Sequence, residues 1–343
     1  MCYNWSLQNW SKKFSEIYAR NDDNLTYSQH WMQVVRHTSR MSEDIRQSWY
    51  KHSMVSLVMA FVWILSFTER VARDLEVTDV GKAISTDMGS TYVEWVLNKY
   101  PLVCALCGNK PCTCSSNRHI IERRKEKMKV EFEEFKKNAE ERIQQAKKRI
   151  VPQMDNLSKM SLNEFLEEFG EIYKGTVYGS RVEDICFHLQ EEVGEVTEAI
   201  WGIESSVGPH TPETWKQWFE KHKKESWNLG NIRAVGANGV PQIIEEIQSK
   251  GKRVDLTAYG GFCREMINEL ADIFSWVCAM LIKIRFLLDD EFQIVDIWTG
   301  QIFTDRSYYT STSRKTHCPH CLQHECTTGC IQSTLLRRLF SKQ

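Results

Sequence analysis

The stretch Val182–Trp201, VEDICFHLQEEVGEVTEAIW, decides the fold, because its apolar side chains recur at helical spacing. These apolar residues are Ile185, Phe187, Leu189, Val193, Val196 and Ile200. Side chains three or four residues apart share one face of a helix, so the stretch predicts an amphipathic helix. Glu191, Glu192 and Glu195 lie within it. A carboxylate turned toward an apolar interior is costly unless a cation meets it.

A second pair of carboxylates lies in another apolar stretch. Glu269 and Asp272 are three residues apart in a helix that we predict over about Phe262–Leu288. Their apolar neighbours are Met266, Ile267, Leu270, Ile273, Phe274, Trp276 and Val277. Acids converging from two helices suit hard divalent ions such as Mg²⁺, which prefer oxygen ligands and leave positions open for phosphate. The two motifs therefore indicate a metal site for phosphate chemistry; the alternative is a pair of solvated Glu-rich helix faces.

The composition of the 343 residues is that of an ordinary water-soluble protein, with 42% hydrophobic and 26% charged residues. With 44 basic and 45 acidic residues, the charge balance gives no reason to expect a nucleic-acid or membrane partner. Few Gly and Pro and many helix formers predict an all-α fold with at most short strands. The longest apolar run, Met54–Phe67, is too short to span a bilayer and predicts a buried helix. The N-terminus lacks a signal-peptide pattern, so we expect a cytoplasmic protein.

The chain contains an internal repeat whose matching segments keep their order. The matches are Phe14-Ser15-Glu16-Ile17-Tyr18 with Phe169-Gly170-Glu171-Ile172-Tyr173, Glu43 and Trp49 with Glu195 and Trp201, Phe61-Val62-Trp63 with Phe274-Ser275-Trp276, and Cys104-x2-Cys107 with Cys318-x2-Cys321. Ordered matches of this kind indicate two versions of one helical unit. We therefore expect units at 1–117 and 152–343, joined by a long charged helix over 118–151.

Two local patterns predict helices outside the acidic motifs. Ser161 with Glu164 is a capping-box pattern that predicts a helix through about Tyr173. From Ile120 to Ile150, apolar residues recur at three- or four-residue steps and predict one long amphipathic helix that ends near Pro152. A connecting helix packed on the units, a coiled-coil seam and a basic nucleic-acid face are the three interpretations of this segment.

The order Glu-Glu-x-x-Glu, then Glu-x-x-Asp on a later apolar helix, resembles the MazG-like all-α NTP pyrophosphohydrolases. Proteins of this family hydrolyse (d)NTPs to the monophosphate and pyrophosphate. They hold Mg²⁺ with the last two acids of the first motif and both acids of the second. The resemblance therefore implies ligands for Mg²⁺ (or Mn²⁺) at Glu192, Glu195, Glu269 and Asp272.

Further residues near the motifs are candidates for roles in the reaction. Bound Mg²⁺ would bridge the anionic triphosphate to the carboxylates and lower the pKa of a water that attacks phosphorus. Glu191 or Glu198 could orient that water. Lys283, three helical turns after Asp272, could meet a phosphate oxygen. His188 lies one turn before Glu191, and we interpret it as a packed or hydrogen-bonded residue rather than a substrate contact.

The sequence departs from the family in the spacing of the two motifs. Glu195 and Glu269 are 74 positions apart, where the family has a short gap. The excess indicates an insertion over about 202–261 that carries several Trp and Lys residues and a Gly-rich part. A lid or base-stacking element and a decorative subdomain are the two interpretations of it.

The first unit differs from the second at the ligand positions. The residues aligned with Glu192, Glu195, Glu269 and Asp272 are Arg40, Glu43, Ser56 and Met59. Three of the four acids are absent, so we interpret this unit as an inactive copy that keeps the helices. Because family members commonly pair through these helices, the resemblance implies an intramolecular pseudo-dimer of the two units; a homodimer is the alternative.

Each unit ends in four cysteines that open with a C-x2-C pair. The two sets are Cys104, Cys107, Cys112 and Cys114, and Cys318, Cys321, Cys326 and Cys330. This spacing is typical of tetrahedral Zn²⁺ sites, so we expect two structural zinc ions. Redox disulfides and free thiols are the alternatives, and His119 or one of His317, His320 and His324 could replace a cysteine. The remaining cysteines are expected to pack as small apolar residues.

The sequence as a whole favours a Mg²⁺-dependent nucleoside triphosphate pyrophosphohydrolase, a hydrolase of phosphoanhydride bonds, with only the second unit active. The alternative is a non-catalytic nucleotide-sensing or scaffold protein whose zinc units bind a partner. A zinc-knuckle nucleic-acid binder is a third possibility, but neither cysteine cluster has a dense basic and aromatic surround.

Overall fold

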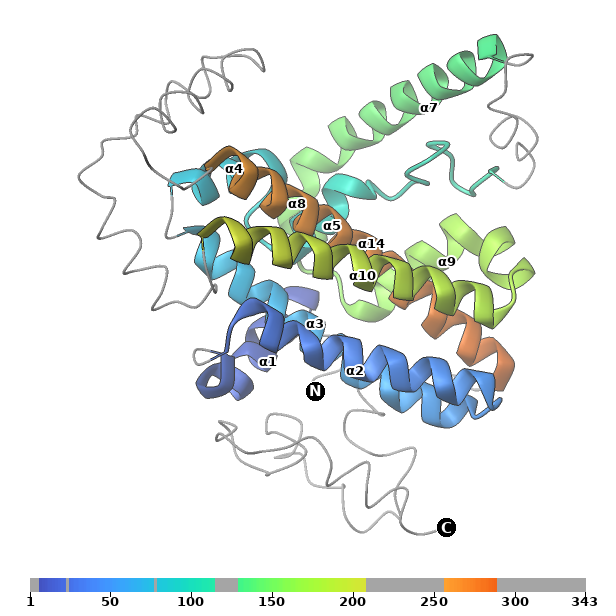
Figure 1. Ribbon diagram of the computed structural model, residues 1–343. Helices are drawn as coiled ribbons and strands as arrows, with labels where there is room; N and C mark the ends of the chain where they lie inside the picture. The colour runs from blue at the N-terminus through green and yellow to red at the C-terminus, as the bar shows by residue number, and fades with distance from the viewer. Residues whose placement is uncertain (1–5, 23–24, 77–78, 115–128, 208–255, 289–343) are drawn as a thin grey trace.

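A computed structural model describes residues 6–22, 25–76, 79–114, 129–207 and 256–288 (Figure 1). Within these ranges the chain is helical, and the one extended pairing is an isolated bridge between Ser6 and Ser161. The α-helices are α1 (Leu7–Asp22), α2 (Tyr27–Arg46), α3 (Tyr50–Glu76), α4 (Asp79–Met88), α5 (Tyr92–Lys99), α7 (Lys129–Ile150), α8 (Met154–Leu157), α9 (Leu162–Gly179), α10 (Val182–Val207) and α14 (Leu256–Leu288). The predicted all-α class is confirmed.

Three of these helices begin with a reciprocal capping box. In α9 the Ser161 hydroxyl accepts a hydrogen bond from the Glu164 backbone, and the Glu164 carboxylate accepts one from the Ser161 backbone, as the sequence predicts. Thr26 and Thr91 start α2 and α5 in the same way. Such caps satisfy N–H groups that have no partner within the helix.

The main core consists of two helical hairpins, α2–α3 and α10–α14, laid against each other (Figure 1). Helices α2 and α10 run antiparallel. The Ser28 backbone N–H donates to Glu204 at one end, and Gln190 donates to the Ser42 hydroxyl at the other. Between them, the Trp31 indole N–H donates to Thr197. Residues of both predicted units therefore share one continuous core.

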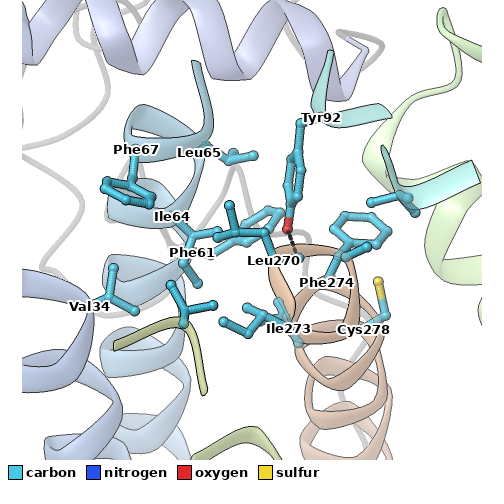
Figure 2. Packing of buried hydrophobic residues seen from close by; sticks show 14 of the residues in the cluster. Val34, Phe61, Ile64, Leu65, Phe67, Tyr92, Leu270, Ile273, Phe274 and Cys278 are labelled. Atoms are coloured by element: carbon cyan, nitrogen blue, oxygen red, sulfur yellow. Dashed lines mark hydrogen bonds between the residues drawn. The ribbon is translucent and has the colours of Figure 1, made fainter. Parts of the chain in front are cut away.

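Helix α3 is the central buried helix. By length and composition it could cross a membrane, but 89% of its most apolar window is buried inside the protein, as expected of a core helix. Figure 2 shows Phe61 of α3 facing Phe274 of α14, with Tyr92 of α5 beside them. The Tyr92 hydroxyl donates to the Leu270 carbonyl over 2.9 Å, so α5 is fixed against α14.

Helix α7 connects the two halves and packs by one face. Ala139, Ala146 and Ile150 are buried, which agrees with a connecting helix packed on the units. A short 3-10 turn over Val151–Gln153 follows it, where the sequence predicts the helix to end. The predicted first turns, over 120–128, lie outside the described residues.

Candidate metal centre

Three carboxylates from two helices meet at one point. Glu192 of α10 and Glu269 and Asp272 of α14 each place a carboxylate oxygen within 4.8 Å of the other two. The three side chains are half-buried, between the apolar faces that pack α10 against α14. The i, i+3 spacing puts Glu269 and Asp272 on one face of α14, and Glu192 faces them from across the helix pair.

The electrostatics of this cluster favour a cation. Burial, followed by the charge of Asp272, raises the pKa of Glu192. Burial also raises the pKa of Glu269, to about 8, even though the ammonium of Lys99 opposes the shift. Mutual repulsion and partial dehydration disfavour the ionised carboxylates. An oxygen-binding divalent ion such as Mg²⁺ would relieve this repulsion, so the donor set fits the predicted metal.

Glu192 is held in place by an indole. The Nε1–H of Trp276, one turn after Asp272 on α14, donates to Glu192 Oε1 over 3.1 Å. The Trp276 ring stacks on the imidazole of His188, with centroids 4.6 Å apart and planes 16° apart. His188 Nδ1 also lies 3.1 Å from a Glu191 carboxylate oxygen, so His188 is a hydrogen-bonded and stacked residue, as its sequence position predicts.

Asp272 is held by two residues from the first half of the chain. Lys99, at the end of α5, forms an ion pair with Asp272 and donates to the Asn268 carbonyl over 3.2 Å. The Tyr100 hydroxyl donates to the other oxygen of Asp272. Burial, with the Asp272 charge, raises the pKa of Tyr100 well above its ordinary value, so this hydroxyl stays a donor. Neither residue is predicted from the sequence, because no local pattern joins positions more than 170 residues apart.

The other predicted site residues lie around this cluster. Glu195 is exposed one turn after Glu192 and interacts with Glu269, so it adjoins the three carboxylates without being part of the tight group. Glu191 and Glu198 are exposed on α10. The structure does not bring Lys283 to the cluster. Its side chain is 7% exposed, and its ammonium donates to the Tyr178 carbonyl over 3.1 Å.

Two of the four aligned positions of the first half contact one buried carboxylate, that of Asp44. The Ser56 hydroxyl donates to Asp44 Oδ2 over 3.1 Å, and Arg40 Nε lies 3.4 Å from Asp44 Oδ1. Glu43 pairs with Arg46 on the surface, and Met59 is buried. Arg40 and Ser56, the positions aligned with Glu192 and Glu269, thus lie on either side of Asp44. Within the described residues, this place holds no group of three carboxylates.

The cysteines of the first predicted zinc site lie together. The Sγ atoms of Cys104, Cys107, Cys112 and Cys114 are all within 4.8 Å of one another, and all four are free thiols. Contacts with the other thiols, Cys104 first, hold the pKa of Cys107 well below its ordinary value, which favours a thiolate. Four converging sulfur ligands fit the tetrahedral coordination of Zn²⁺.

The cysteine loop is fixed to both neighbouring helices. The Cys112 N–H donates to the Ile172 carbonyl of α9 over 2.7 Å, and Arg142 of α7 donates to the Cys107 carbonyl over 3.0 Å. Gly108 has a φ of +68°, and a Cβ there would lie 2.7 Å from the Arg142 Cβ. Only glycine allows this close approach of the loop to α7.

Other predictions fall on residues that the structure does not describe. The second cysteine cluster (Cys318, Cys321, Cys326 and Cys330), most of the insertion, and His119 lie outside the described residues. Cys186, Cys263 and Cys278 are buried free thiols, as expected of cysteines that pack as apolar residues.

Comparison with protein-family models, with curated proteins and with solved structures finds no match to this chain.

Proposed function

We propose that the protein is a Mg²⁺-dependent nucleoside triphosphate pyrophosphohydrolase that converts (d)NTP and water to (d)NMP and pyrophosphate. The observation that carries the proposal is the convergence of Glu192, Glu269 and Asp272 from α10 and α14. These are three of the four positions that the MazG-like pattern implies, and the fourth, Glu195, adjoins them.

The chain's own residues would bind and orient the reactants. Mg²⁺ held by the carboxylates would supply Lewis-acid polarisation of the phosphoryl oxygens and acidify a water. Trp276 and Tyr100 fix the orientation of Glu192 and Asp272 through hydrogen bonds. Outer hydrogen bonds of this kind usually determine how well metal ligands are preorganised. Glu191 and Glu198 are exposed on α10 and are the candidates that could accept a proton from the attacking water.

The two halves would act as one pseudo-dimer, with the first half inactive. The antiparallel contact of α2 with α10 and the shared core support this arrangement. The first cysteine cluster would hold structural Zn²⁺ between α7 and α9. We extend this zinc proposal to the second cysteine set and keep the cytoplasm as the proposed location.

The test is incubation of the purified full chain with a panel of (d)NTPs and Mg²⁺, followed by separation of the nucleotide products. We expect a monophosphate and pyrophosphate in equal amounts from at least one triphosphate. Release of diphosphate and phosphate would contradict the proposed bond cleavage. Binding without any turnover would favour the nucleotide-sensing alternative instead.

A further inference from the structure

Lys99 is a cationic side chain of the first half that lies directly against the carboxylates of the second half. We propose that Lys99 binds the polyphosphate chain of the nucleotide, so that the half without the metal ligands supplies a substrate-binding residue. The inference rests on the proposed function, because it takes a nucleoside triphosphate as the ligand.

Among the described residues, the ammonium group has protein partners for two of its donors. A lysine ammonium carries three N–H donors. Two of them are accounted for by Asp272 and by the Asn268 carbonyl. The Lys99 side chain remains 28% exposed, so its head can reach a ligand that approaches from solvent. Lysine is a common phosphate-binding residue in proteins, where it acts as a point charge.

The charge of the site favours such a group. The charge of Lys99 acts on Glu269 as well as on Asp272, so its ammonium lies over the same cluster of acids that would hold the metal. A triphosphate carries roughly four negative charges and is repelled by these acids. Metal ions offset part of that repulsion, and a lysine at the edge of the cluster offsets more of it next to the phosphate oxygens.

Helix α5 presents Lys99 rigidly. At its start, Tyr92 donates to the Leu270 carbonyl of α14. After its end, the chain enters the cysteine loop, where the Cys112 N–H bonds the Ile172 carbonyl of α9. Binding groups supported by packed elements on both sides are held accurately, so little ordering cost remains when a ligand arrives.

The experiment measures binding without turnover, in the full chain, for Lys99→Met and Lys99→Arg. The probes are Mn²⁺ alone, deoxynucleoside triphosphates with a methylene group between the α- and β-phosphorus, and the matching monophosphates, each with Mn²⁺. Losing a charge-assisted hydrogen bond of about 1.5–3 kcal/mol corresponds to roughly a 10- to 150-fold weaker affinity. We expect Lys99→Met to weaken triphosphate binding by that factor. Its Mn²⁺ binding should be no weaker than that of the natural protein, and its monophosphate affinity should stay within about threefold of the natural value. Lys99→Arg should recover most of the triphosphate affinity.

Lys110→Met is the matched control. Lys110 also forms an ion pair between the two halves, with Glu168 of α9, but it lies in the cysteine loop. This variant should bind the triphosphate analogue like the natural protein. Equal losses of Mn²⁺ and triphosphate in Lys99→Met would overturn the proposal, because Lys99 would then only orient Asp272. Unchanged triphosphate binding, or no binding by the natural protein, would also overturn it. If the analogue binds but no triphosphate is hydrolysed, the proposed reaction is wrong. The affinities of the Lys99 variants for the analogue still show whether Lys99 binds the polyphosphate.

Discussion

Phe61 and Phe274, which the predicted sequence repeat aligns with each other, have ring centroids 6.1 Å apart in the shared core (Figure 2). In a twofold arrangement, a residue meets its own counterpart only near the axis. Helices α2 and α10 also run antiparallel, as two helices related by a twofold axis do. These contacts support the proposed pseudo-dimer, because residues of both halves lie in one continuous core.

Removing the ring of Phe61 should destabilise the whole described fold. Phe61 is 1% exposed, and Phe→Ala substitutions in a core cost about 3–5 kcal/mol because they leave a cavity. We expect Phe61→Ala to lower the free energy of unfolding by that amount. Denaturant titration measures the change and should show one cooperative transition. Phe187→Ala is the control, since Phe187 is 68% exposed and should change stability by about 0.5 kcal/mol or less. Two separate transitions, with only one affected, would argue for independent halves.

Turnover should depend on the clustered carboxylates. Glu192→Gln and Asp272→Asn each remove an ionised ligand while keeping the side-chain shape. Because metal-ion stabilisation is worth several kcal/mol, we expect losses of about a hundredfold or more in kcat/KM, with weaker Mn²⁺ binding. Glu183→Gln, on the exposed side of the same helix, is the control and should keep full turnover. Equal activity of Asp272→Asn and the natural protein would exclude this cluster as the catalytic site.

Trp276 should act on the metal through Glu192. Trp276→Phe keeps an aromatic ring but removes the N–H that bonds Glu192. Loss of an outer hydrogen bond typically costs about 10- to 100-fold in metal affinity, and we expect the lower end because Glu192 remains. Mn²⁺ titration measures the change. The first half offers a matched control, Trp49→Phe, because Trp49 also packs on a histidine, His52, with ring centroids 5.6 Å apart. A similar effect of both substitutions would mean that Trp276 has no specific role at the metal.

The four-cysteine cluster should account for one of two bound zinc ions. We expect elemental analysis to give two equivalents of zinc per chain and one equivalent after Cys107→Ser. The melting temperature should also fall, because the loop that zinc would hold is hydrogen-bonded to α7 and α9. Cys278→Ala removes a buried thiol outside the cluster and should keep both ions. Full zinc content in Cys107→Ser would contradict the assignment of these four ligands.

The sequence predicts what depends on short spacing and misses what depends on tertiary contact. The Ser161 cap, the pairing of Glu269 with Asp272 and the C-x2-C cluster each follow from neighbours a few residues apart. Lys99 meets Asp272 because α5 packs against α14, where the Tyr92 hydroxyl also donates to the Leu270 carbonyl. Such a contact has no signature within either segment.

Two candidate residues show a further limit of helical spacing. Lys283 shares a face with Asp272, yet the packing of α9 presents the Tyr178 carbonyl to it, and this acceptor holds the ammonium three turns from the cluster. Glu195 shares the face of Glu192 but lies one turn along and remains exposed. The 3.6-residue period gives the face of a helix. Only the neighbouring helices decide how deeply each residue on that face is buried.

Asp44 should make the stability of the protein depend on pH. Burial raises the pKa of this carboxyl above its ordinary value of about 3.9, with the Ser56 hydrogen bond and the Arg40 charge opposing. The folded state therefore binds more protons than the unfolded state, and stability falls as pH rises from about 3.9 through the folded pKa. The carboxylate is then destabilising at every higher pH. Asp44→Asn keeps an acceptor for Ser56 without the charge, so it should raise the melting temperature more at pH 8 than at pH 4.5. Asp184→Asn is the control, because Arg181 lowers the pKa of that exposed carboxyl. A gain for Asp44→Asn that is the same at both pH values would show that the charge of Asp44 is not the destabilising element.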